Sequence, residues 1–85
     1  MPRTIRSAGQ LALTQILAAE RKRAGLTQAD LASRLHCHQS LIARIESGER
    51  RIDVVELIIL ARAIGVSPEE LTTRVSAVVP ADERL

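Results

Sequence analysis

The pattern of apolar and polar residues between Leu26 and Gly48 is typical of two short helices joined by a tight turn. Apolar residues recur three or four positions apart, as they do along the buried side of a helix. They lie at Leu31, Leu35, Ile42 and Ile45. Ala32 is small, so two helix axes can cross closely there. The second helix of the pair then presents its polar side to solvent.

Five helices are predicted from residues that mark helix ends. A helix start often carries Ser, Thr or Asp at the cap and an acidic residue three positions on, which together form a capping box. Such starts occur at Thr27 with Asp30, at Asp53 with Glu56, and at Ser67 with Glu70, where Pro68 also suits the first helical position. Glycines at positions 25, 48 and 65 end helices. The predicted helices span about residues 10–24, 28–35, 38–47, 54–64 and 68–75.

The domain organisation follows from these elements. No segment shows strand alternation between hairpin turns, so the expected fold is all-α, a compact five-helix domain. A chain of 85 residues suits one domain. We expect a basic, poorly ordered arm over residues 1–9 with Arg3 and Arg6, a helical domain over residues 10–75, and a tail over residues 76–85.

Composition and charge limit the kinds of molecule that the chain is expected to bind. The chain has no aromatic residue, so its core must consist of Leu, Ile, Val and Ala, and single-stranded nucleic-acid binding by base stacking is disfavoured. Residues 1–51 carry nine Arg or Lys and four acidic residues, a net +5, whereas residues 52–85 carry three Arg and six acidic residues, a net −3. A basic first half favours a polyanionic partner, although two solvated faces would give the same numbers.

The Cys and His residues do not indicate catalysis. Cys37 is the only cysteine, which excludes a disulfide framework and favours a reducing compartment. His36, Cys37 and His38 are adjacent and cannot easily converge on one metal ion, and Ser40 near His38 lacks the rest of a catalytic set. We expect no metal, no cofactor and no enzymatic activity. Without a transmembrane-length apolar run or a signal-peptide core, we expect a cytoplasmic protein away from the membrane.

Residues 11–75 resemble the phage-repressor family, the lambda repressor-like or Xre-type regulators. The matching residues of the helix-turn-helix are Leu26, Gln28, Leu31, Ala32, Leu35, Cys37, Ile42, Ile45, Glu46 and Gly48. The matching residues outside it are Arg21, Gly25, residues 50–53, Leu57, Ala61 and residues 64–66. Two positions differ from the family. His36 stands where the turn usually has Gly and a positive φ, and His38 stands where Ser or Thr commonly caps the third helix.

The third helix carries the residues that we expect to contact DNA bases. Its buried side is taken by Ile42 and Ile45, so the polar residues face outwards. The expected base-contacting residues are His38, Gln39, Ser40, Ala43 and Arg44. A Gln can pair with adenine, an Arg with guanine, and an Ala methyl group can meet a thymine methyl group. Leu41 fits either the core edge or a DNA contact, and an ordinary solvated polar face is the competing interpretation.

Other residues are expected to contact phosphates or to hold the domain together. The resemblance implies that Gln28 bonds a backbone phosphate at the positive end of its helix. Arg50 and Arg51 are expected to contact phosphates, or one of them to enter the minor groove, unless they serve only solubility. The resemblance also implies a structural ion pair between Arg21 and Glu46.

Apolar residues late in the chain are candidates for a homodimer interface, unless they only close the core. They are Leu71, Val75, Val78 and Val79, with Ile59 and Leu60 as additions. We therefore predict a transcriptional regulator that binds a palindromic operator on double-stranded DNA as a homodimer. The resemblance implies that it represses its own promoter. The competing hypothesis is a protein-interaction module, such as an antitoxin or an antiactivator that sequesters a partner protein, motivated by the acidic second half.

Overall fold

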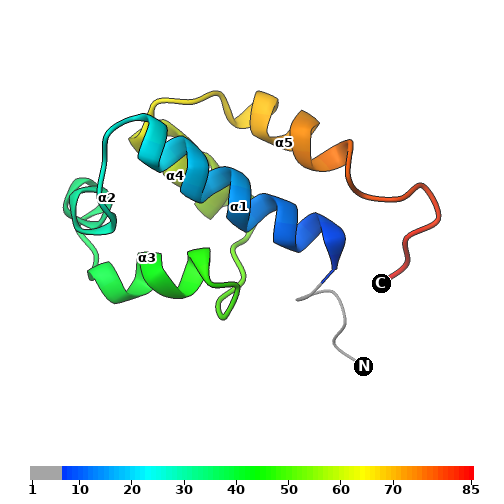
Figure 1. Cartoon of the computed structure of the whole chain (residues 1–85), viewed down its shortest axis with the longest axis horizontal. Helices are drawn as coiled ribbons and strands as arrows, with labels where there is room; N and C mark the ends of the chain where they lie inside the picture. Colours follow the sequence, from blue (N-terminus) through cyan, green and yellow to red (C-terminus); the bar gives the residue numbers. More distant parts are fainter. Residues whose placement is uncertain (1–6) are drawn as a thin grey trace.

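Five helices follow one another along residues 7–85, the part of the chain that the computed structural model describes (Figure 1). They are α1 (Ala8–Arg23), α2 (Gln28–Leu35), α3 (Gln39–Glu46), α4 (Val54–Ile64) and α5 (Pro68–Ser76). Since residues 7–85 contain no strand, the expectation of an all-α fold is confirmed. Arg3 and Arg6, the charged residues of the expected arm, lie outside the described residues.

Side-chain caps explain where the helices begin. Reciprocal capping boxes open α2 and α4, as predicted, through Thr27 with Asp30 and Asp53 with Glu56. At α5, the Ser67 hydroxyl accepts a hydrogen bond from the Glu70 amide at 3.2 Å and donates one to the Glu69 carboxylate at 3.0 Å. The start of α1 was predicted two residues too late. Ser7 caps this helix by accepting from the Gln10 amide at 3.2 Å, so residues 7–9 belong to α1 and its cap rather than to the arm.

The turn between α2 and α3 has the conformation that the sequence predicted. His36 has φ 55° and ψ 43°, and among residues 7–85 it is the one non-glycine residue with a positive φ. A left-handed conformation is unfavourable for a residue with a Cβ, so the backbone is strained at this point. His38 occupies the cap position of α3 with no hydrogen bond from its side chain to the helix. The entry to α3 is therefore held by packing rather than by a polar cap.

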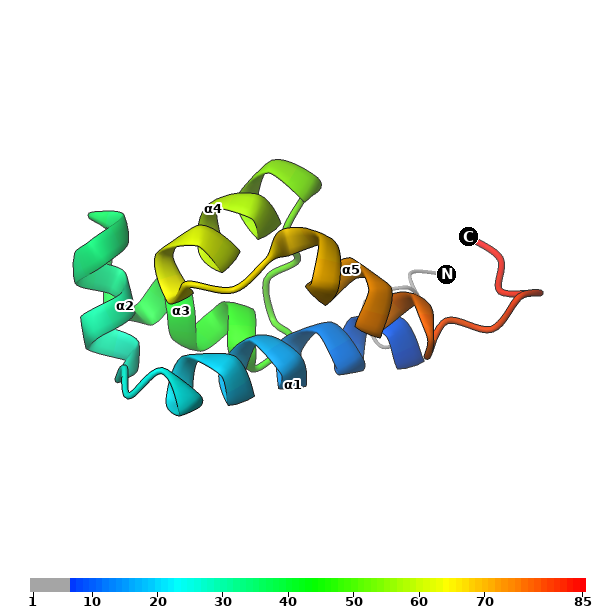
Figure 2. The same ribbon diagram turned by 90° about the horizontal axis from the view of Figure 1, so that it is seen from above.

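The helices enclose a small aliphatic core. α1 packs against α3, α4 and α5, and α2 packs against α3 and α4 (Figure 2). The core consists of Leu17, Leu31, Ala32, Ile42, Ile45, Leu60, Ala61, Ile64 and Leu71. Every helix contributes residues to this core, including α1 through Leu17 and α5 through Leu71. The helix-turn-helix formed by α2 and α3 thus packs against α1 and α4, and α5 packs against those two helices.

One buried carboxylate joins α1 to α5. Glu20 is only 6% exposed, and a buried charge requires a partner of opposite sign. Its Oε2 atom lies 2.9 Å from Arg74 Nη1 of α5 and 3.4 Å from Arg23 Nη1 of α1. The sequence analysis did not predict this pairing.

The last nine residues return beside the start of α1 (Figure 1). Val79 and Leu85 line a hollow together with Ser7, Gln10 and Leu13. Val79 comes so close to Gly9 that a Cβ atom built on that glycine would lie 2.7 Å from Val79 Cγ2. Part of the expected tail therefore packs on the domain. None of the helices formed by residues 7–85 has the length and apolar character needed to cross a membrane.

Candidate DNA-binding surface

The outer face of α3 carries the polar residues that the sequence analysis assigned to base contacts. Gln39, Ser40 and Arg44 are exposed, whereas Ile42 and Ile45 are buried against the other helices. His38 is exposed just before the helix. Ala43 and Leu41 are half-buried, and Leu41 packs against the core. Figure 1 shows α2 nearly end-on and α3 lengthwise, so the two helices cross steeply and α3 forms one edge of the molecule.

A buried ion pair joins α1 to the end of α3, between the residues for which the resemblance implied one. Arg21 Nε lies 2.7 Å from Glu46 Oε2, and Arg21 Nη2 donates to Glu46 Oε1 at 3.0 Å. Arg21 Nη1 also donates to the Leu26 carbonyl at 2.7 Å. The two side chains are only 8% and 11% exposed. This bidentate geometry fixes α3 relative to α1, because a planar guanidinium and a carboxylate match in one orientation.

Two glutamines extend this pair to the exposed start of α3. Gln28 Nε2 donates to Glu46 Oε1 at 2.9 Å, and Gln39 Nε2 donates to Gln28 Oε1 at 2.7 Å. The four side chains form one chain of hydrogen bonds across α1, α2 and α3, which we call the Arg21–Gln39 chain. The sequence analysis treated both glutamines only as DNA contacts and missed their mutual bond. The sequence contained one signal for this bond, because a glutamine stands at the first position of both α2 and α3.

The ion pair changes the acidity of both its members. Burial opposes ionisation of Glu46, but the hydrogen bonds from Arg21 and Gln28 outweigh it, so the pKa of Glu46 is lowered. The hydrogen bond to Glu46 likewise raises the pKa of Arg21 against the effect of burial. Both side chains are therefore charged at neutral pH, as the pairing requires.

The arginines after α3 differ in their surroundings. Arg50 Nη2 lies 2.8 Å from Glu56 Oε2, and Arg50 Nη1 donates to Glu56 Oε1 at 3.3 Å and to the Arg51 carbonyl at 3.2 Å. The hydrogen bond from Arg50 lowers the pKa of Glu56. This pair, which the sequence analysis did not predict, directs the Arg50 guanidinium towards α4. Arg51 is exposed on the same loop.

The candidate dimer residues divide into core and surface. Leu71 is 1% exposed and Leu60 is 5% exposed, so both belong to the core and their assignment to an interface was wrong. Val75 is half-buried, while Val78 and Val79 are 44% and 41% exposed. A second apolar surface lies on α4, of which the sequence analysis had named only Ile59. It consists of Val54, Val55 and Ile59, which are 71%, 64% and 49% exposed.

No metal centre is found within residues 7–85, where no three His, Cys, Asp or Glu side chains lie close enough to share an ion. Cys37 is a half-buried free thiol beside the core, and the histidines on either side of it are exposed.

Comparison with known proteins identifies the family to which this chain belongs. A family model described as helix-turn-helix matches residues 17–71. A solved structure described as an XRE-family like protein from Pseudomonas syringae pv. tomato str. DC3000 superimposes with a TM-score of 0.82. The two chains are 40% identical over 92% of this chain and 95% of that one. A comparison with curated proteins finds no match. The chain belongs to the XRE-type, lambda repressor-like helix-turn-helix family of DNA-binding regulators.

Proposed function

We propose that the protein is a transcriptional repressor that binds a specific double-stranded DNA sequence with α3 in the major groove. The observation that carries the proposal is the Arg21–Gln39 chain. It holds Gln39 at the exposed start of α3, five residues before Arg44, which is exposed on the same helix. A base-contacting side chain that is fixed before DNA arrives loses less conformational entropy when it binds.

The roles on α3 follow from hydrogen-bonding chemistry. Arg44 suits the O6 and N7 acceptors of guanine, and Gln39 suits the N6 and N7 groups of adenine. The Ser40 hydroxyl can donate or accept a hydrogen bond at guanine or at adenine. The methyl group of Ala43 suits a thymine methyl group. His38, just before the helix, lies beside the first base pair. These assignments are supported by the exposure of the polar side chains and by the family of the chain.

Phosphate contacts are proposed on both sides of α3. Gln28 uses one amide hydrogen for Glu46, and its second amide hydrogen together with the positive N-terminus of α2 suits a phosphate oxygen. Arg51 is exposed and suits the DNA backbone beyond the C-terminal end of α3. Arg50 is a weaker candidate than the sequence analysis assumed, because its guanidinium is paired with Glu56.

We propose that the repressor acts in the cytoplasm as a homodimer on a palindromic operator. Exposed valines at the end of the chain and on α4 supply apolar area for a second copy. Two copies related by a two-fold axis would present two α3 helices to half-sites about one helical turn (~34 Å) apart.

A second function is favoured by the exposed apolar residues on α4. Val54 and Val55 are adjacent at the start of α4 and are 71% and 64% exposed, and exposed apolar residues that lie together can mark a protein contact. A protein-interaction module, such as an antitoxin or antiactivator, would use this surface for its partner. Co-purification from the native host without DNA separates the two functions, because a stable heterocomplex is expected only of the interaction module.

The test of the proposed function compares two arginine variants. Arg44→Ala removes the proposed guanine contact and is expected to cost about 1–3 kcal/mol of binding at one operator position, with relaxed preference at that base pair. Arg62→Ala is the matched control, because it removes the same charge from an exposed position on α4. Quantitative binding to a set of single-base operator variants measures both. Unchanged sequence preference in Arg44→Ala would refute the assignment of α3 as the recognition helix.

A further inference from the structure

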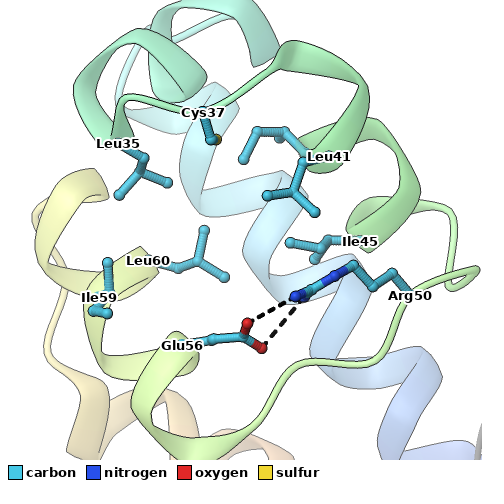
Figure 3. Close-up of a pocket in the computed structure, with 9 residues that line it drawn as sticks. Leu35, Cys37, Leu41, Ile45, Arg50, Glu56, Ile59 and Leu60 are labelled. Atoms are coloured by element: carbon cyan, nitrogen blue, oxygen red, sulfur yellow. Dashed lines mark hydrogen bonds and ion pairs between the residues drawn. The ribbon is translucent and has the colours of Figure 1, made fainter.

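A cavity of about 150 Å³ lies between α3, α4 and the end of α2 (Figure 3). Its walls are aliphatic and include Leu35, Leu41, Ile42, Ile45 and Leu60. The sequence analysis assigned Leu35, Ile42 and Ile45 to the buried sides of their helices, where close packing would leave no such space. A space of about this volume can hold a molecule the size of benzene. The space therefore has the size and the lining of a small ligand site.

Solvent can reach the cavity on the side of α4. Ile59 lines it and is 49% exposed, and the Arg50 and Glu56 side chains at its edge are 34% and 35% exposed. Figure 3 shows the Arg50–Glu56 pair at one end of the space and Leu35 with Cys37 at the other. A molecule would thus meet a polar entrance and an apolar interior, which is the usual construction of a small-molecule site.

The polar entrance selects against charged molecules. Arg50 and Glu56 neutralise each other, so the entrance offers no net counter-charge to a charged ligand, and the apolar interior does not compensate such a ligand for the water that it loses. Three of the five guanidinium N–H groups of Arg50 are engaged, two by Glu56 and one by the Arg51 carbonyl. The other two remain for an acceptor on an incoming molecule.

We propose that this cavity is a binding site for a small, uncharged, mainly apolar molecule that carries one hydrogen-bond-accepting oxygen. Its apolar part fills the space between Leu41 and Leu60, and its oxygen accepts from Arg50. The occupant then contacts the inner side of α3, the helix whose outer side carries Gln39 and Arg44. The binding itself does not depend on the proposed function.

The absence of aromatic residues makes the site testable with an aromatic probe. Because the chain has no Phe, Tyr or Trp and its only other aromatic rings are those of His36 and His38, a ring-current change that appears on titration reports the ring of the probe. Benzyl alcohol, titrated into the full chain, is expected to shift the methyl signals of Leu35, Leu41, Ile59 and Leu60 together along one saturating curve. Benzoate and benzylamine are expected to bind at least tenfold more weakly. Equal binding of all three, or shifts spread over the whole surface, would overturn the proposal.

Variants on α4 provide the matched comparison. Ile59→Phe places a ring at the mouth of the cavity and is expected to weaken binding of benzyl alcohol at least tenfold. Val55→Phe adds the same ring at a 64% exposed position that does not line the cavity, and it is expected to leave binding unchanged. Undiminished binding in Ile59→Phe would contradict the proposed location.

A third measurement uses the wild-type chain and so avoids any folding defect of the variants. The Cys37 thiol lines the cavity and is the only thiol of the chain, so saturating benzyl alcohol is expected to slow its reaction with a disulfide reagent at least fivefold. An unchanged rate would refute occupancy. Methyl shifts that follow protein concentration rather than probe concentration would instead assign this face to a second copy and overturn the ligand site.

Discussion

The buried ion pair between Arg21 and Glu46 allows the account to be tested through stability. Arg21→Met keeps much of the side-chain volume but removes three hydrogen bonds, two to Glu46 and one to the Leu26 carbonyl. Glu46 would remain charged at 11% exposure with Gln28 as its hydrogen-bond partner. The variant thus leaves the charge of Glu46 without its counter-charge, and this destabilises a protein more than removing both charges together.

The expected cost is large for a domain of this size. Removing one partner of a buried ion pair costs about 3–5 kcal/mol. A chain of 85 residues has a total stability of roughly 4–13 kcal/mol at the usual range per residue. Each kcal/mol lowers the melting temperature of such a domain by about 4–8 °C, so Arg21→Met is expected to lower it by at least about 12 °C.

Thermal and urea unfolding followed by circular dichroism measure this loss. Arg23→Met is the control on the same helix, since its side chain is 80% exposed and an exposed pair contributes at most about 1 kcal/mol. The double variant Arg21→Met/Glu46→Leu is expected to recover most of the loss, because it removes both charges together. A loss below about 1 kcal/mol in Arg21→Met, no greater than in the control, would refute the account of this pair.

The same pair predicts a pH dependence with a defined sign. The pKa of Glu46 is lowered from its ordinary value of 4.5 in the folded chain, so the unfolded chain binds the proton first as the pH falls. The contribution of the pair is therefore complete above about pH 4.5 and is lost as the pH falls through the lower folded value. Wild type is expected to lose stability over this interval relative to the double variant, and parallel pH profiles would contradict this.

Three further predictions concern the glutamine contact, the turn and the tail. Gln28→Ala should weaken binding to all DNA sequences, because it removes a phosphate contact. It should also relax the preference at the base that faces Gln39, because it removes the hydrogen bond that holds Gln39. Unaltered affinity in a gel-shift titration would contradict both the phosphate contact and the positioning of Gln39. His36→Gly should raise stability by about 1 kcal/mol in urea unfolding, because glycine accepts the positive φ without strain, and no gain would indicate that the turn is unstrained. Gly9→Ala should gain less than the about 1 kcal/mol that alanine usually contributes over glycine within a helix, because its methyl group would lie 2.7 Å from Val79 Cγ2 and would displace that side chain. Val79→Ala in the same chain should restore the full gain, and additive effects of the two changes would contradict the contact.

The helices and most of their ends were predictable because their causes are local. A capping box involves residues three positions apart, such as Thr27 and Asp30, and its geometry depends on nothing farther along the chain. The positive φ of His36 was expected from the resemblance, because the family usually has Gly at this position of the turn. Ser7 was predictable too, because Ser7 with Gln10 three positions on fits the Ser-x-x-Gln form of the capping box, and it was missed because only acidic residues were considered at that position.

Contacts between distant segments could not be predicted in the same way. The bond between Gln28 and Gln39 depends on how steeply α2 and α3 cross, and the pair of Arg50 with Glu56 depends on the path of the loop between them. Whether a leucine such as Leu71 faces the core or a second copy also requires the packed structure, because both places favour the same side chain.

The most direct test of the central claim, that α3 gives this protein sequence-specific DNA binding, is selection of bound duplexes from a random pool. The account predicts an enriched motif of two inverted half-sites with centres about 10 base pairs apart. Selection with Arg44→Ala should retain this spacing and lose preference at one base pair in each half-site. A pool that binds without any enriched sequence would contradict the claim.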